Sequence, residues 1–254
     1  MRNLLFFINM YQTNANLYAT TLFTFLSTMT GQHRKVNSED YVYDAFKGRL
    51  LNGFYSRRER ITEEGVAREF STTRTVVRKV FSKLEEESLL QKEAHKGVRV
   101  REISLREAME IIDLRILLEK YAVSHFCETA TTGDLERLRG ILSSMKDALG
   151  KRDHGLYSRL NTQFHEVIYY GSGNNTLSSL LVNIKARLMR YQFKISYIPG
   201  RSEESFKEHY RIFLALEKRD ALEAQRSVEL HLESLRTIML DNKELLEVNE
   251  VIVY

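Results

Sequence analysis

Residues 71–87 read STTRTVVRKVFSKLEEE, and this stretch decides the fold of the N-terminal part of the chain. Its apolar residues recur at the spacing of one helix face: Val77, Val80, Phe81 and Leu84. The basic residues fill the other positions, with no acid before Glu85: Arg74, Arg78, Lys79 and Lys83. The pattern predicts an amphipathic helix whose N-terminal half is cationic.

Thr73 is placed to cap this helix, which would leave free backbone N–H groups and the positive end of the helix dipole at its start. Arg74 and Arg78 lie one turn apart there, and phosphate is the natural ligand for such an end. The same composition also fits a solvated surface helix with basic residues. The flanking sequence decides between the two interpretations.

Helices are expected at 38–51, with Ser38 as the cap, and at about 62–70. The second leads through Ser71-Thr72 into the basic helix, which is the pattern of a helix-turn-helix. Apolar and basic residues then alternate on both sides of a turn at 95–97, which predicts a two-stranded wing. We therefore expect a winged helix-turn-helix DNA-binding domain at 36–102, with its recognition helix in a major groove.

Composition sets the broad class. The chain has 254 residues, 43% of them hydrophobic, which is enough for two domains with cores of their own. A net charge of +4 permits nucleic-acid binding without arguing for it, and the lone Cys127 fits a reducing cytoplasm. Residues 1–35 hold no apolar run long enough to span a membrane. We expect a poorly ordered extension there, of which 1–28 would be an upstream extension of the reading frame.

From Ser104 the chain is predicted to be helical almost to its end, beginning with a capping box at Ser104 and Glu107. Six helices are expected, at about 104–129, 133–149, 153–171, 174–197, 202–218 and 220–242. Short loops between long helices imply an antiparallel bundle. The expected fold class is mostly α: a winged helix-turn-helix followed by an all-α effector-binding and dimerisation domain at 103–245, with a tail at 246–254.

Three of the seven histidines are candidates for one site inside the bundle. His165 follows Asn161 by four residues, so both side chains lie on one helix face. The midpoint between His209 and His231 is Asp220, in the expected hairpin, which puts both imidazoles roughly 16 Å from that turn on adjacent helices. Three imidazoles and an oxygen donor can hold zinc or a similar divalent metal. The alternative is that each histidine is an ordinary hydrogen-bonded core or surface residue.

The N-terminal pattern resembles the GntR superfamily of bacterial transcription regulators, around Thr73 to Arg78, then Leu84-Glu85 and Gly97. The resemblance implies DNA contacts from the recognition helix and the wing tip: Arg74, Thr75, Arg78, Lys96 and Gly97. The chain departs from the family pattern before and within the recognition helix, with Ser71 in place of glycine and Val76 in place of proline.

The bundle resembles the C-terminal ligand-sensing domain (FCD domain) of the FadR branch, and its six helices resemble the VanR-like subgroup. The resemblance covers Asn161 to His165, Glu208 to Arg211, and the stretch that closes at His231-Leu232. It implies a metal held by Asn161, His165, His209 and His231, with a zinc-like or nickel-like ion as the cofactor. Many members have aspartate at the position of Asn161, and an amide oxygen is a neutral and weaker donor.

Arg115 matches an arginine of the family's first bundle helix that can point into the cavity. Beside a metal, its guanidinium would suit a small carboxylate effector. The alternative is an Arg115–Glu119 pair on the helix surface.

We therefore expect a cytoplasmic, homodimeric transcription regulator that binds a palindromic DNA operator and responds to an organic or sugar acid, with no membrane partner. A second hypothesis is a metal-dependent enzyme that uses the three histidines, with Glu208 as a base. The sequence shows no recognisable catalytic triad or phosphate-binding glycine loop, so no enzyme activity is expected. A third hypothesis is a helical adaptor tethered by residues 1–28.

Overall fold

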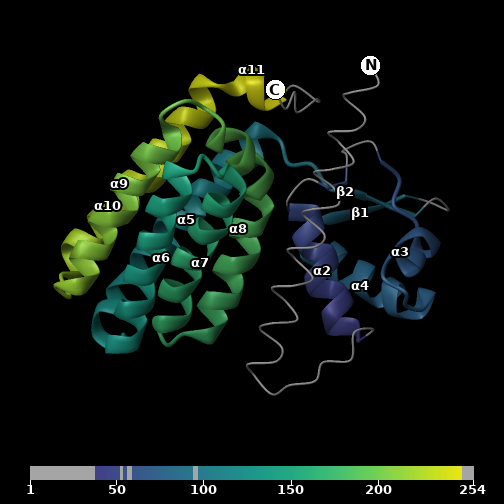
Figure 1. The fold of residues 1–254 in the computed structure, drawn as a ribbon, viewed down its shortest axis with the longest axis horizontal. Coiled ribbons are helices and arrows are strands. Elements are labelled where there is room, and N and C mark those ends of the chain that lie inside the picture. Colours follow the sequence, from purple (N-terminus) through teal and green to yellow (C-terminus); the bar gives the residue numbers. More distant parts are fainter. Residues whose placement is uncertain (1–37, 52–53, 56–58, 94–96, 248–254) are drawn as a thin grey trace. The chain divides into compact units, whose positions relative to one another are not determined.

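The computed structural model describes residues 38–51, 54–55, 59–93 and 97–247 (Figure 1). The predictions for 1–35, for Lys96 and for the tail beyond residue 247 lie outside the described residues. The described part is mostly helical, with one two-stranded sheet. This confirms the predicted fold class.

Three helices form the N-terminal part: α2 (Glu39–Leu51), α3 (Glu63–Glu69) and α4 (Arg74–Glu86). Ser38 accepts a hydrogen bond from the Tyr41 N–H, and Thr73 accepts one from the Val76 N–H, so both predicted caps are present. The apolar face predicted for α4 is buried throughout, with Val77, Val80 and Leu84 fully inaccessible.

Ser71 stands at the turn between α3 and α4 with a φ of 49°. This is the left-handed region, which favours glycine because Cβ crowds the backbone there. The position is the one at which the sequence departs from the glycine of the family pattern. The chain therefore makes the turn with a strained residue.

The wing consists of β1 (Leu90–Glu93) and β2 (Gly97–Val100), paired antiparallel with Leu90 opposite Val100. Ile61 joins the edge of β2 through two backbone hydrogen bonds to Val98, each 2.9 Å long. Gly97 has a φ of 93°, and a Cβ built on it would lie 2.4 Å from the Ile61 carbonyl oxygen. Only glycine fits this close approach of backbone to backbone.

The C-terminal part is a helical bundle whose elements end within one or two residues of the predicted positions. Its helices are α5 (Leu105–Thr129), α6 (Thr132–Gly150), α7 (His154–Gly171), α8 (Asn175–Ser196), α9 (Arg201–Glu217), α10 (Ala221–Asp241) and the short α11 (Lys243–Glu247). The short α11 was not predicted from the sequence. Side-chain caps at Ser104, Thr131, Asp153, Asn174 and Asp220 explain the sharp helix starts.

The cap at Ser104 differs from the prediction in one respect. Its hydroxyl accepts a hydrogen bond from the Glu107 N–H, as a capping box requires. The Glu107 carboxylate, however, binds Arg101 and Arg187. The complete capping box of the bundle is at Thr131 and Asp134.

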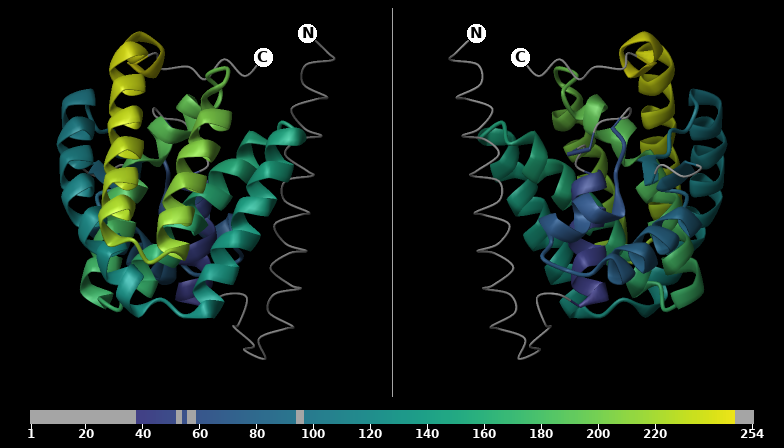
Figure 2. Two further views of the ribbon diagram at one scale, coloured as in Figure 1. Left: turned by 90° about the vertical axis from the view of Figure 1, so that its left-hand side faces the viewer. Right: turned by 90° about the vertical axis from the view of Figure 1, so that its right-hand side faces the viewer.

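Within the bundle α7 contacts α5, α6 and α8, and α10 packs against α5 and α9. The two views of Figure 2 show α9 and α10 running side by side as a hairpin. The shared core consists mainly of aliphatic and aromatic residues, among them Ile112, Phe126, Phe164 and Leu232. Inside this apolar frame lies a group of buried polar residues. No helix in the described part of the chain is both long and apolar enough to cross a lipid bilayer.

Candidate functional site

The recognition helix carries its predicted DNA-binding residues on the outside. Arg74 and Arg78 have side chains 64% and 63% exposed, and Thr75 is also exposed. Both arginines bind the same acid, Glu63 at the start of α3: Arg78 through two hydrogen bonds of 3.0 Å and Arg74 through one of 3.4 Å. The hydrogen bonds and charge of Arg78 hold the pKa of Glu63 below its usual range.

Another acid partner lies on α2, where Glu39 pairs with Lys79 at 3.2 Å. The sequence analysis described the N-terminal half of this helix as cationic because α4 itself has no acid there. The structure shows that acids from α2 and α3 pair with that charge. At the wing, Gly97 is half-buried against Ile61, so a structural role accounts for it.

The three predicted histidines meet in the bundle core. His165 on α7, His209 on α9 and His231 on α10 are all buried, and one ring nitrogen from each lies within 4.8 Å of the other two. The rings of His209 and His231 have centroids 4.6 Å apart, at one height on the α9–α10 hairpin. The spacing argument about Asp220, which caps α10, predicted this arrangement.

Each histidine is oriented by an acceptor on its Nδ1 atom. His165 donates to Glu119 at 3.1 Å, His209 to the Ser205 carbonyl oxygen at 2.6 Å, and His231 to Glu208 at 2.7 Å. These acceptors place the protons on Nδ1 and leave the Nε2 lone pairs free. The Nε2 atoms of His165 and His209 lie only 3.2 Å apart. Two lone pairs facing each other at that distance need a cation or a proton between them.

Asn161, the predicted fourth donor, lines the same cavity as His231. Its Oδ1 atom is buried, and no described residue donates a hydrogen bond to it. A buried acceptor without a partner is costly unless something outside the protein's own groups binds it. Three neutral imidazoles and an amide oxygen suit a zinc-like divalent ion, with carboxylates behind two of the histidines as is usual for metal sites. The residues present therefore fit the metal that the fold family implies.

Burial keeps the histidines in the form that binds metals. It lowers the pKa of His165 to about 3, assisted by the nearby Lys185 ammonium and opposed by Glu119. Burial likewise lowers the pKa of His209 and that of His231. Burial alone would raise the pKa of Glu119, but Arg115 and His165 outweigh it and lower that pKa. The cluster is thus a set of neutral imidazoles supported by ionised carboxylates.

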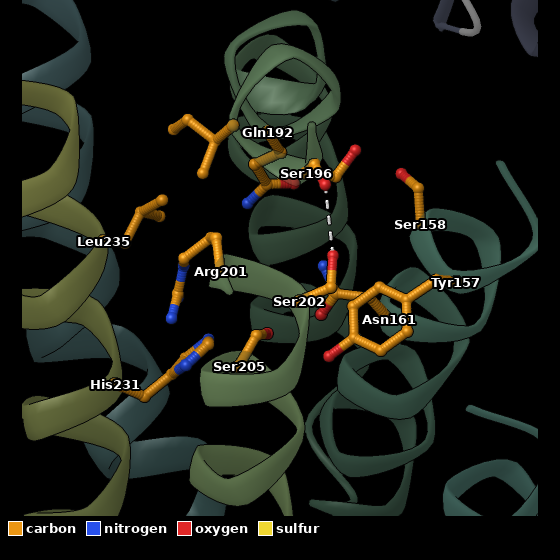
Figure 3. Close-up of a pocket in the computed structure, with 11 residues that line it drawn as sticks. Tyr157, Ser158, Asn161, Gln192, Ser196, Arg201, Ser202, Ser205, His231 and Leu235 are labelled. Carbon is orange, nitrogen blue, oxygen red and sulfur yellow. Dashed lines mark hydrogen bonds between the residues drawn. The ribbon is translucent and has the colours of Figure 1, made fainter. Parts of the chain in front are cut away.

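A cavity of about 40 Å³ adjoins His231 and Asn161 (Figure 3). Side chains from α7, α8, α9 and α10 converge on it, and hydroxyl and amide groups dominate the lining: Tyr157, Ser158, Asn161, Gln192, Ser196, Ser202 and Ser205. Arg201 is the charged residue of this lining, which also includes the neutral His231. Its guanidinium binds both oxygens of Glu208, each at 3.0 Å.

Arg115 lies on α5, in the core of the bundle. It forms the predicted bond to Glu119, at 2.7 Å, but both residues are buried in the core rather than on the helix surface. It is not among the residues that line the 40 Å³ cavity. Within the described structure its Nη1 and Nη2 atoms have no hydrogen-bond partner.

Three functional candidates were not predicted from the sequence, Lys185, Arg201 and Glu63, and Glu119 was named only as a surface partner of Arg115. Lys185 is buried on α8, and burial together with the charge of Arg115 lowers its pKa to about 7. Its Nζ atom finds no hydrogen-bond partner in the described ranges. For Lys185 the sequence signal was a charged residue on the apolar face of α8, and such a signal does not reveal a partner on another helix.

Two protein-family models match the chain. The model for "Bacterial regulatory proteins, gntR family" matches residues 39–100, and the FCD domain model matches residues 110–234. The chain belongs to the GntR family of transcription regulators. The FCD domain is consistent with the FadR branch, as the sequence analysis expected. The narrower VanR-like assignment stays a prediction.

Relatives of the regulator agree with this placement. An uncharacterised HTH-type transcriptional regulator of Bacillus subtilis, YdhC, is 29% identical over 80% of this chain and 92% of its own length. The Escherichia coli repressor RspR is 24% identical over 72% of this chain and 82% of its own. The solved structure of E. coli McbR/YncC shares the fold, with a TM-score of 0.74, 21% identity and coverage of 81% of this chain and 98% of its own.

The matched families and relatives are transcription regulators, so the regulator is not an enzyme. The hypothesis of a metal-dependent enzyme is not supported. Glu208, its suggested base, is held by Arg201 and His231, whose hydrogen bonds and charges lower its pKa to about 2 against the opposing effect of burial. The carboxylate positions a histidine and is a weak base.

Proposed function

We propose that the regulator binds a palindromic operator as a homodimer in the cytoplasm, and that a small carboxylic acid bound beside a divalent metal changes its operator affinity. The observation that carries the proposal is the set of three buried histidines, each oriented through Nδ1, beside a hydroxyl-lined cavity. A structural core gains little from three desolvated imidazoles whose free nitrogens face one another.

On the DNA side, Arg74, Thr75 and Arg78 are proposed to reach base edges and phosphates from α4, and Lys96 and Gly97 to approach the backbone from the wing tip. The exposure of the α4 residues supports this assignment. Arginine is suited to the task because its fork can bind guanine or phosphate with two hydrogen bonds.

On the effector side, His165, His209, His231 and Asn161 are proposed to hold the metal. A bound metal would supply an open position for a carboxylate oxygen. The neutral Asn161 leaves more of the ion's charge to be balanced by the effector than an aspartate would. Arg115 stays a predicted effector contact, supported by its Nη atoms, which bind no acceptor in the described part of the chain.

Dimerisation is proposed to use the outer faces of α5 and α10, which pack against each other. Both carry exposed large apolar residues on one side: Leu114, Leu117 and Tyr121 on α5, and Leu222, Leu230 and Leu240 on α10. A patch of this kind on a monomer commonly marks an interface, and a two-fold dimer buries the same patch on both copies. Sedimentation of Leu117→Glu should give monomers, and Leu180→Glu on α8 is the control.

Effector binding can regulate operator binding only through a difference in affinity between conformations. An effector can shift operator binding only if it binds one arrangement of the paired winged helices better than another. The effect on transcription, repression or activation, then depends on which arrangement binds DNA.

The experiment begins with selection and sequencing of genomic fragments retained by the purified protein. Operator affinity is then measured by fluorescence anisotropy for the wild type, for Arg78→Ala and for the exposed α5 control Arg106→Ala. We expect Arg78→Ala to bind at least about tenfold more weakly, with a salt slope smaller by about one. Unchanged affinity across the salt series would contradict the assignment of the recognition helix. Small carboxylates added with zinc should alter wild-type operator affinity.

A further inference from the structure

A groove of about 610 Å³ lies between α6 and α7, which pack side by side in the bundle (Figure 1). It shares no lining residue with the 40 Å³ cavity, and none of the three clustered histidines lines it. Its volume is in the range of small-molecule sites, so it has room for an organic ligand. Residues at helical spacing line it from the facing sides of the two helices: Asp134, Arg137 and Ile141 on α6, and Glu166, Val167 and Tyr170 on α7.

Two opposite charges face each other across the groove. Arg137 and Val167 are equidistant from Arg152 in the turn between the helices, so Arg137 and Glu166 lie at one height. Burial raises the pKa of the Glu166 carboxyl, and the charges of Lys185 and Arg137 oppose that effect. Neither Arg137 nor Glu166 forms a hydrogen bond or a close ion pair with a residue in the described part of the chain. The two groups interact electrostatically across the groove without binding each other.

The third charged residue of the lining is already bound. The Asp134 carboxylate accepts hydrogen bonds from the backbone N–H and the hydroxyl of Thr131, at 2.9 and 2.7 Å. Near the end of α7, the Thr129 hydroxyl donates to the Gly171 carbonyl oxygen at 2.6 Å. The charged groups of this lining that remain for a ligand are therefore one carboxylate and one guanidinium.

Apolar surface lies beside these two charges. Val167 is buried, Ile141 is half-buried and Tyr170 is 56% exposed. Tyr170 follows Glu166 by four residues, so its ring lies one turn along the same face of α7. An apolar ligand side chain can pack on this surface while charged groups of the same ligand reach Arg137 and Glu166.

We propose that the groove binds a free α-amino acid with an apolar side chain, as a second ligand of the regulator. The ammonium group binds Glu166, and the carboxylate binds the guanidinium fork of Arg137. A ligand with both charges neutralises both groups, whereas an amine or a carboxylic acid alone leaves one of them unpaired. The inference goes beyond the proposed function and depends on neither the metal nor the carboxylic acid of that proposal.

The test is titration calorimetry on the full chain, freed of metal so that no amino acid can chelate an ion at the histidines. The probes are L-leucine, L-phenylalanine and L-alanine, with isocaproate and isoamylamine as leucine analogues that lack the ammonium and the carboxylate, respectively. We expect one site per chain, with a Kd for leucine or phenylalanine of about 1 mM or lower and weaker binding of alanine. Each analogue should bind at least about tenfold more weakly than leucine.

Two variants assign the charges. Arg137→Gln and Glu166→Gln should each weaken leucine binding at least about tenfold. In Glu166→Gln leucine and isocaproate should bind alike, and in Arg137→Gln leucine and isoamylamine should bind alike, a pattern that a loss of stability would not give. Arg139→Gln and Glu136→Gln are the matched controls, because both residues lie on α6 outside the groove lining, and both variants should bind leucine as the wild type does.

Circular dichroism before each titration verifies that the variants are folded. Absence of binding of all three amino acids to the wild type at roughly 10 mM would overturn the inference. Equal leucine affinity of the wild type and the folded Arg137→Gln and Glu166→Gln variants would also overturn it, because the ligand would then lie elsewhere. The same holds if isocaproate or isoamylamine binds the wild type as tightly as leucine, since the site would then not require both charges.

Discussion

Glu63 is the residue on which the DNA-binding surface of α4 depends in the free protein. It accepts hydrogen bonds from both Arg74 and Arg78, the two residues proposed to contact DNA. If these arginines bind DNA as proposed, its phosphates must compete with a carboxylate for the same donors. The acid lies 11 residues before Arg74 and 15 before Arg78, on another helix.

Glu63→Gln should increase DNA affinity about two- to tenfold, because Arg74 and Arg78 no longer have to break ion pairs with Glu63 before they bind phosphate. The salt dependence of binding should become steeper. Anisotropy titrations over a salt series measure both effects. Glu64→Gln is the matched control, because Glu64 pairs with Arg68 and not with α4. Equal affinity of the wild type and Glu63→Gln would show that the pair does not restrain the arginines.

Residue spacing predicted the three histidines but not the groups that orient them. The 22-residue separation of His209 and His231 about Asp220 carried enough information, because a helix hairpin pairs residues equidistant from its turn. Glu119 lies 46 residues before His165 and belongs to another helix, so no local pattern linked the two. The carboxylate–histidine contacts emerge only from tertiary packing.

Gly97, at the start of β2, lets the wing lie close to the segment before α3, where Ile61 and Val98 form two backbone hydrogen bonds. Gly97→Ala would place a methyl group 2.4 Å from the Ile61 carbonyl oxygen at a φ of 93°. We expect the variant to lose about 2 kcal/mol or more of unfolding free energy, measured by urea denaturation. Gly140→Ala, in open space within α6, should instead gain about 0.5–1 kcal/mol.

Helix boundaries were the most predictable part of the fold. Ser38, Thr73 and Ser104 all cap helices where the sequence indicated. Caps can be read locally because the side chain binds a backbone N–H only two or three residues away. The short α11 was missed because five residues carry too little periodicity to stand out from a tail.

For the molecule as a whole, the neutral buried histidines make stability depend on pH. Their pKa values are lowered in the folded state, to about 3 for His165, so below about pH 6.5 the unfolded chain binds protons that the folded chain does not. Stability must therefore fall as the pH falls through this range. The lowered pKa values of Glu119 and Glu208 act in the same direction at still lower pH.

We expect the unfolding free energy of the metal-free protein to fall between pH 6 and 5, by about 1.4 kcal/mol per pH unit for each histidine that stays neutral in the folded state, as His165 does. Urea denaturation followed by circular dichroism measures the slope. His209→Gln should make the slope shallower, because it removes one histidine whose pKa is lowered in the folded state. A stability that does not change between pH 7 and 5 would contradict the neutral buried cluster.

The most direct test of the account is a calorimetric titration of zinc into metal-free protein, beside His209→Ala. We expect about one zinc ion per chain for the wild type and loss of that binding in the variant. Absence of binding in the wild type would mean that the amide of Asn161 marks a site that no longer holds metal. Equal binding in His209→Ala would place the metal elsewhere, and either result would contradict a metal centre at the three histidines.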